Sequence, residues 1–197
     1  MRASASTTES YLRLSQISLF SLLLVCSLII PAVSERNGGV SSFGDHLSTV
    51  VPYSLSFLLC IIFLCLAAKT VLEMGASFRV MAYLLLIIAF FDFLILISTF
   101  PRRVSPIFYQ IHDWLGIALY TYEFLLSIWF ISRQWKLKTA VAFSVECFGS
   151  IVGLLSSLKI IHFLYYGQVI GALGFGILLV VVFPYIIDMS RVREDNR

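Results

Sequence analysis

Three histidines are the side chains in this chain best suited to a metal site. They are His46, His112 and His162, and three acids are expected at similar depth, namely Glu35, Asp45 and Asp113. Imidazoles and a carboxylate could hold a divalent metal ion and activate a water molecule for hydrolysis. No HxxxH or HExxH spacing links any two of the histidines, so only the fold can bring them together. The alternative is three independent interfacial or hydrogen-bonding residues.

A second group consists of acids inside apolar segments. Asp92, Glu123 and Glu146 each lie within a long hydrophobic run. An ionised carboxylate at mid-span costs about 2.5–3.5 kcal/mol on insertion scales, so these groups must face the bundle interior, pair or stay protonated. We therefore predict a buried polar seam formed by these three acids, with at least one of Glu123 and Glu146 neutral.

The helix faces around these acids are polar or small. One face carries His112, Gly116, Tyr120, Glu123 and Ser127, and another carries Thr139, Glu146, Gly149, Ser150, Gly153 and Ser157. These spacings of three and four residues fit a helix, and a GxxxG pair permits close helix approach. We expect the two faces to pack together as neighbours, so that Glu123 and Glu146 could share a proton. The functional alternative is a polar cavity that opens outward.

The elements that position these residues are membrane-spanning helices. Apolar residues make up 59% of the 197 residues and charged ones 13%, with a mean hydropathy of +0.95. A soluble domain of this size has too little interior to bury that surface. A span needs about 20 apolar residues. Six such runs predict an all-α, polytopic membrane helix bundle in a single domain over residues 1–197, with spans at about 14–33, 50–72, 79–98, 108–131, 139–158 and 164–187.

The first span has two interpretations. Arg2 and Arg13 precede an apolar run that ends in Pro31-Ala32-Val33-Ser34, which is typical of a signal peptide with a small-residue cleavage site. The leader would be long, however, and Pro31 lies close to the proposed site. We favour a retained helix.

The basic residues predict the orientation. Ten lie on one predicted face, namely Arg2, Arg13, Lys69, Arg79, Arg133, Lys136, Lys138, Arg191, Arg193 and Arg197. The other face carries four, namely Arg36, Arg102, Arg103 and Lys159. Because cytoplasmic loops collect Lys and Arg, both termini are expected in the cytoplasm, and we predict a multi-pass protein of the plasma (cell inner) membrane.

Short motifs at the predicted outer side resemble a known family. The chain reads Pro31-Ala32-Val33-Ser34-Glu35, His46-Leu47-Ser48, Ser98-Thr99-Phe100-Pro101 and Ile111-His112-Asp113. This pattern is similar to that of the DRAM/Frag/Sfk-like six-helix membrane proteins and the related bacterial membrane family of unknown function, over nearly the whole chain in length and helix count. The resemblance implies Phe100, Pro101 and His112 as family-marking positions, with His46 and Ser48 beside them. It implies no reaction, but eukaryotic relatives are tied to lipid remodelling, lipid organisation and autophagy.

These observations favour a membrane protein without catalysis. The sequence contains no nucleophile elbow, Walker loop, GxGxxG, CxxCH or CxxC motif, and we expect no cofactor. It has no basic stripe for nucleic acid, so the expected partners are membrane lipids, a membrane protein or a second copy. Arg102 and Arg103 beside His112 could form a lipid-headgroup cradle, the alternative being an ordinary snorkelling pair. The competing hypothesis is a membrane-embedded metal-dependent hydrolase or a small transporter that uses the outer histidines and acids.

Overall fold

The computed structural model shows a bundle of long helices and describes residues 5–32, 38–101 and 105–195. Six of its helices are long and apolar enough to cross a membrane, and these described residues contain no strand. The long helices are α1 (Ala5–Ile29), α3 (Val50–Leu72), α4 (Arg79–Thr99), α5 (Pro106–Arg133), α6 (Leu137–Ser157) and α7 (Leu164–Asp195). The all-α, six-span prediction is thus confirmed, and the chain is a multi-pass membrane protein.

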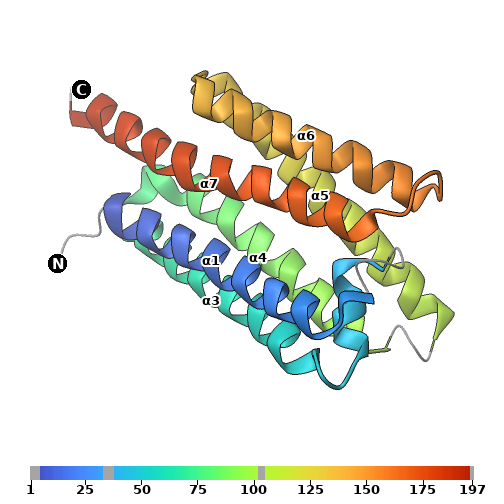
Figure 1. Ribbon diagram of the computed structural model, residues 1–197. Helices are drawn as coiled ribbons and strands as arrows, with labels where there is room; N and C mark the ends of the chain where they lie inside the picture. The colour runs from blue at the N-terminus through green and yellow to red at the C-terminus, as the bar shows by residue number, and fades with distance from the viewer. Residues whose placement is uncertain (1–4, 33–37, 102–104, 196–197) are drawn as a thin grey trace.

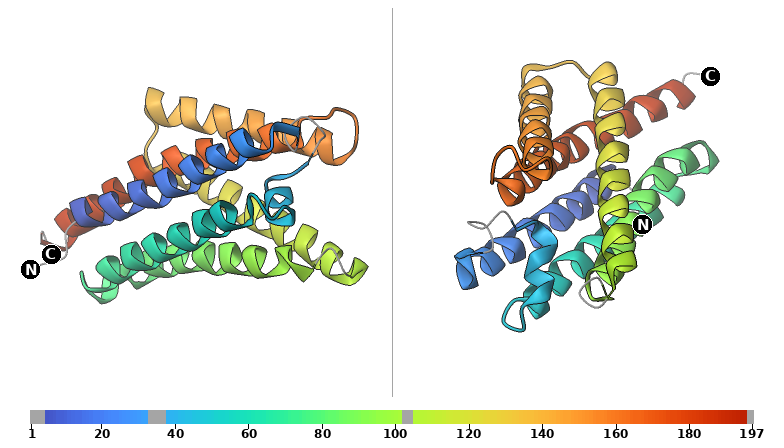
Figure 2. Two further views of the ribbon diagram at one scale, coloured as in Figure 1. Left: turned by 60° about the horizontal axis from the view of Figure 1, so that its bottom comes forward. Right: turned by 90° about the vertical axis from the view of Figure 1, so that its right-hand side faces the viewer.

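Helix α7 is the centre of the arrangement. It packs against α1, α5 and α6, while α1 packs on α3, α3 on α4, and α4 on α5 (Figures 1 and 2). Helices α1, α3, α4, α5 and α7 therefore close a ring, and α6 lies outside that ring against α7. Both ends of the chain lie at the same end of the bundle (Figure 1), which we call the terminal end.

Local sequence signals set the helix ends. Helix α5 begins at Pro106, whose fixed φ suits the first helical position. Helix α6 begins with a capping box in which Thr139 Oγ1 accepts the Lys136 backbone N–H at 2.9 Å. Gly75 has a φ of 138°, which allows the tight reversal into the short helix η2 (Ala76–Phe78) and α4.

The first helix differs most from its predicted bounds. We predicted 14–33, whereas α1 begins at Ala5 and ends at Ile29. A hydropathy window detects only the apolar run, and the first turns are polar. They are nevertheless helical, with Arg13 paired to Glu9 one turn earlier. Thr8 in these turns is fully buried and bonds to Thr70 on α3 at 2.9 Å.

The end opposite the termini is closed by the loop that carries the short helix η1 (Val40–Asp45). Phe43 of η1 is fully buried and meets Tyr165 edge to face, with ring centroids 5.5 Å apart. The Val40 backbone N–H donates to Gln168 Oε1 on α7 at 2.8 Å, and Thr49 Oγ1 donates to the Phe43 carbonyl at 2.6 Å. The loop therefore ties the first and last thirds of the chain together.

Glycines bring α6 and α7 into direct backbone contact. A Cβ at Gly149 would overlap the backbone of Gly171, and a Cβ at Gly167 would overlap that of Gly153. Gly174 lies equally close to the Glu146 backbone. This small-residue packing explains why α6 binds to α7 more extensively than to any other helix.

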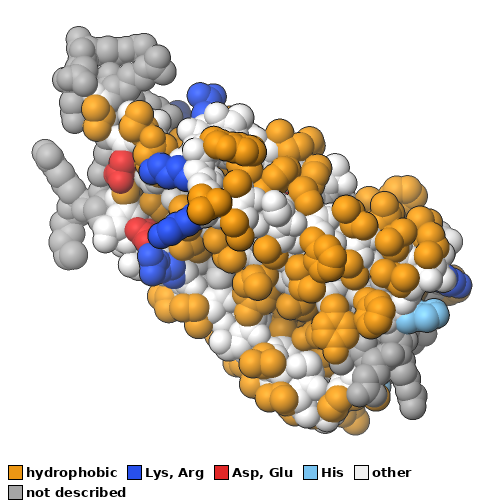
Figure 3. All heavy atoms as spheres, turned by 45° about the horizontal axis from the view of Figure 1, so that its top comes forward, with side chains coloured by type: hydrophobic (Ala, Val, Ile, Leu, Met, Phe, Trp, Pro, Cys, Tyr) orange, Lys and Arg blue, Asp and Glu red, His pale blue; other side chains and the backbone are white. Residues whose placement is uncertain are grey.

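The outward surface of the bundle is apolar between its two ends. The face over α6 and α7 is covered by hydrophobic side chains, with lysines and arginines gathered at one end (Figure 3). Exposed examples on three helices are Leu28, Val51 and Ile151. Such a belt is expected where the solvent is lipid.

Candidate functional site

The three histidines do not assemble as metal ligands. His112 is buried and its Nδ1 lies 2.8 Å from Ser98 Oγ on α4, whereas His46 and His162 are exposed. No group of three or more His, Cys, Asp and Glu side chains among the described residues could hold a metal ion. The described fold therefore does not bring His46, His112 and His162 together, and it uses His112 to link α4 to α5.

The predicted headgroup cradle can be described only in part. Arg102 and Arg103 lie outside the described residues, and His112 is turned into the α4–α5 contact. Of the positions that the resemblance implies, Phe100 is exposed and Pro101 follows the end of α4, so the Phe-Pro pair ends that helix at the bundle surface. Ser48 is exposed beside His46.

The three acids of the predicted polar seam do lie in one region. Asp92 on α4 is 6% exposed, Glu146 on α6 is 2% exposed, and Glu123 on α5 is half-buried between them. Glu123 interacts electrostatically with both other carboxyls. Cys60 on α3 completes the group, with its Sγ 3.8 Å from Asp92 Oδ2. We call Asp92, Glu123 and Glu146 the carboxyl cluster.

No described cation compensates the carboxyl cluster. The lysines and arginines whose side chains are described are all exposed, namely Arg13, Lys69, Arg79, Arg133, Lys136, Lys138 and Lys159. The two ion pairs within the described residues, Arg13–Glu9 and Lys69–Glu73, are also at the surface. Three ionised carboxylates in this setting would repel one another without screening by water.

The helix faces that we predicted to pack on each other are only loosely joined. Helix α6 turns its glycines to α7, and its contact with α5 is sparse. One bridge is the hydrogen bond between Tyr120 Oη and Ser150 Oγ at 2.9 Å. The prediction that α5 and α6 pack closely was therefore wrong, because the α7 glycines offer a better surface for close approach than the tyrosine-bearing face of α5.

Unsatisfied polar atoms line this loose contact. Across residues 5–32, 38–101 and 105–195, three buried side-chain oxygens have no hydrogen-bond partner: Ser127 Oγ on α5, Gln134 Oε1 at the C-cap of α5, and Glu146 Oε2 on α6. Ser127 approaches the Glu146 carboxyl, and Gln134 lies two turns further toward the terminal end. Buried groups without partners usually mark bound water or an ion.

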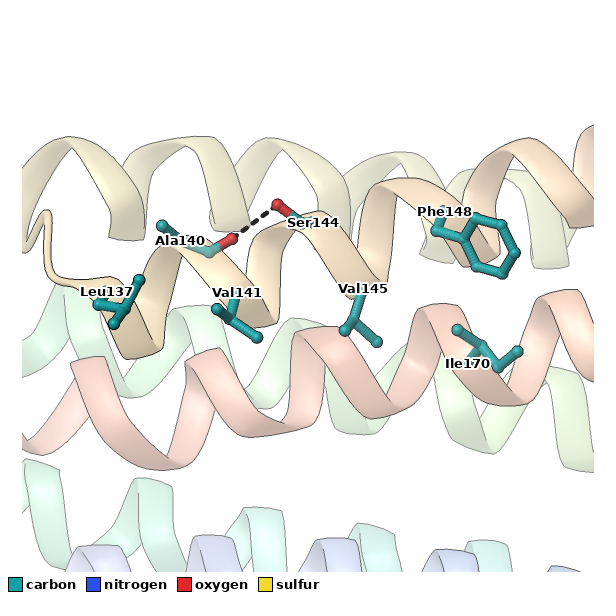
Figure 4. A pocket seen from close by; sticks show the side chains of 7 residues that line it. All are labelled: Leu137, Ala140, Val141, Ser144, Val145, Phe148 and Ile170. Atoms are coloured by element: carbon teal, nitrogen blue, oxygen red, sulfur yellow. Dashed lines mark hydrogen bonds between the residues drawn. The ribbon is translucent and has the colours of Figure 1, made fainter.

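A groove on the outer surface of α6 and α7 was not anticipated from the sequence. It has a volume of about 470 Å³ and is lined by Leu137, Ala140, Val141, Ser144, Val145, Phe148 and Ile170 (Figure 4). Its one hydroxyl, that of Ser144, already donates to the Ala140 carbonyl at 2.9 Å. The groove therefore offers an apolar surface whose single side-chain hydroxyl already has a hydrogen-bond partner. We call it the α6–α7 groove.

Cations lie beside the terminal end of this groove. Lys136 and Lys138 flank Leu137, and both are exposed. The Lys136 ammonium lies 5.4 Å from the centroid of the Tyr185 ring on α7, which holds it over the α6–α7 contact. Trp135, which is 74% exposed, sits at the same level as an interfacial aromatic. The run of Trp135, Lys136 and Lys138 is visible in the sequence. The groove is not, because it forms only where α6 and α7 meet.

Comparison with known proteins gives no independent assignment, because no protein-family model, curated protein or solved structure matches this chain.

Proposed function

We propose that this protein is a multi-pass protein of the plasma (cell inner) membrane that binds an anionic phospholipid in the α6–α7 groove. One acyl chain lies along the groove, and the headgroup phosphate meets Lys136 and Lys138. The observation that carries the proposal is the junction of an outward-facing apolar groove with two exposed cations at its terminal end.

The length of the groove supports a lipid chain as its occupant. From Leu137 to Phe148 it covers eleven helical steps, or about 17 Å at 1.5 Å per residue. The hydrocarbon core of a bilayer is about 30 Å thick, so one leaflet contributes about 15 Å. A groove of this length, starting at the headgroup level marked by Trp135, matches one acyl chain of one leaflet.

The charge pattern supports the cytoplasmic leaflet. Ten of the fourteen Lys and Arg residues belong to the terminal end by sequence position, and such residues collect in the cytoplasm. Anionic lipids attract basic segments there with about 1 kcal/mol for each Lys or Arg near the surface. Both termini are cytoplasmic on this proposal.

The resemblance to the DRAM/Frag/Sfk-like proteins agrees with this function and remains part of the proposal. Six spans and the Phe100-Pro101 ending of α4 support it. The competing metal-dependent hydrolase is not favoured, because the described histidines form no metal-holding group.

Native mass spectrometry of the purified protein tests lipid binding. Retention of phosphatidylglycerol is expected to exceed that of phosphatidylcholine. The double variant Lys136→Gln, Lys138→Gln should weaken phosphatidylglycerol binding about 30-fold, because removing two cations costs about 2 kcal/mol of binding free energy. Lys69→Gln is the matched control, because it removes a cation at the terminal end of α3. This variant should change phosphatidylglycerol binding little.

A bulky substitution separates the groove from the cations. Val141→Trp fills the groove and should reduce retention of both lipids, whereas Val51→Trp on the exposed face of α3 should not. Equal retention by all these variants would refute the proposal. A wild-type dimer that Val141→Trp dissociates would instead assign the groove to a second copy of the chain.

A further inference from the structure

The second candidate site, independent of the lipid groove, is the carboxyl cluster between α4, α5 and α6. We propose that Asp92, Glu123 and Glu146 form a proton-binding site that exchanges protons with water from the terminal end, along Ser127 and Gln134.

No lysine or arginine with a described side chain faces the carboxyl cluster, because all of them are exposed at the surface. The titratable groups that face the cluster are Cys60 from α3, Tyr120 from α5 and Cys147 from α6, together with the three carboxyls themselves. None of these is a cation. On α7, which packs against Glu146, the contact is made by Gly174. Neutrality must therefore come from bound protons or from a cation that is itself a ligand.

The oxygens of the carboxyl cluster are placed to hold a proton rather than a metal ion. The described cluster provides no group of three ligands arranged to hold a metal ion. Glu146 Oε2 is almost fully buried and has no hydrogen-bond partner, and the hydroxyl of the buried Ser127 interacts with the Glu146 carboxyl. A protonated carboxyl needs one acceptor, and a hydroxyl can both accept and donate. The pair is thus suited to hold and pass a proton.

Buried polar groups without partners lead from the carboxyl cluster toward the terminal end. Two of the three unpartnered oxygens lie on α5 and α6, whose mutual contact is sparse. The third belongs to Gln134, the buried C-cap of α5 that opens the loop at the terminal end. A water that bridges two to four such groups would satisfy them. Protons taken up by the carboxylates come from bulk water through these positions.

Infrared difference spectroscopy of the protein in lipid vesicles tests proton occupancy directly, because protonated carboxyls absorb apart from carboxylates. Wild-type protein at neutral pH should show the band of a protonated carboxyl in an apolar setting. Glu123→Gln and Glu146→Gln should each remove part of it. Asp188→Asn, an exposed acid on the terminal part of α7, is the matched control and should leave it unchanged.

Two further readouts make the result decisive. The band should shift in deuterated water, and Ser127→Ala with Gln134→Leu should slow that shift by at least tenfold if these residues carry the access path. A shift at the wild-type rate in this double variant overturns the path. A missing band, or one that appears only when Na⁺ and K⁺ are removed, overturns the proton-binding site in favour of ionised carboxylates that hold a cation.

Discussion

Alanine at Gly149 and at Gly153 should have opposite effects, although both glycines belong to one GxxxG motif on α6. A Cβ at Gly149 would lie 2.6 Å from the Gly171 Cα and 2.8 Å from the Gly167 carbonyl oxygen. A Cβ at Gly153 would meet only the Gly167 carbonyl carbon, at 3.9 Å, which is ordinary contact. The obstacle at Gly149 is backbone, which cannot move aside without separating the helices.

The magnitude follows from two effects. Both substitutions gain about 0.8–1 kcal/mol of helix propensity, so this contribution cancels between them. Overpacking at Gly149 costs about 1–3 kcal/mol, with the upper part of the range expected for a backbone obstacle. At about 2–4 °C for each kcal/mol in a chain of this size, Gly149→Ala should melt roughly 2–12 °C below Gly153→Ala.

Thermal unfolding in one detergent and again in lipid vesicles measures this difference. Gly153→Ala should equal or exceed the wild type, which controls for general effects of a glycine replacement in α6. If both variants unfold at the same temperature, α6 does not pack on α7 through Gly149, and the backbone contact described above is refuted.

Three other outcomes are expected. Glu146→Gln should be tolerated, whereas Glu146→Lys should impair expression and stability. Only the lysine places a cation in the apolar seam, where a charge costs about 2.5–3.5 kcal/mol of insertion free energy. Equal losses in the two variants would show that the carboxylate charge itself is required. Single cysteines at Trp135 and Ser105 should be labelled from opposite sides of intact cells, and labelling of both from one side would contradict the six-span topology. Replacing His46 and His162 by Gln should leave metal content and folding unchanged, whereas loss of stoichiometric zinc would restore the metal hypothesis.

The sequence predicts the spans well because span length and hydropathy are local properties. Four predicted spans lie within two residues of α3, α4, α5 and α6 at each end, whereas α7 begins where predicted and continues eight residues past the predicted end at 187. The first helix was misplaced because its polar first turns are stabilised by Thr8 and Thr70, a contact between distant segments. The short helix η1 was missed for the same reason, since its Phe43 is buried by partners on other helices.

The carboxyl cluster was predictable in kind but not in arrangement. Burial of Asp92 and Glu146 follows from the cost of charge in an apolar helix. The choice of partner for α6 did not follow, because a small-residue face can pack against any neighbour. The glycines at 167, 171 and 174 could have identified α7 as the partner of α6. They lie three or four residues apart, as Gly149 and Gly153 do on α6, and so form a second small-residue face.

The central place of α7 has a consequence for biogenesis. Helices are synthesised in order, so α1, α3, α4, α5 and α6 enter the bilayer before α7, the helix against which α1, α5 and α6 pack. Until α7 arrives, the η1 loop lacks Gln168 and Tyr165, and the α6 glycines face lipid. A nascent chain stalled before residue 164 therefore leaves the η1 loop without its partners on α7 and the glycine face of α6 uncovered. The bundle is completed only when α7 inserts, because α7 is the helix that joins α1 to α6.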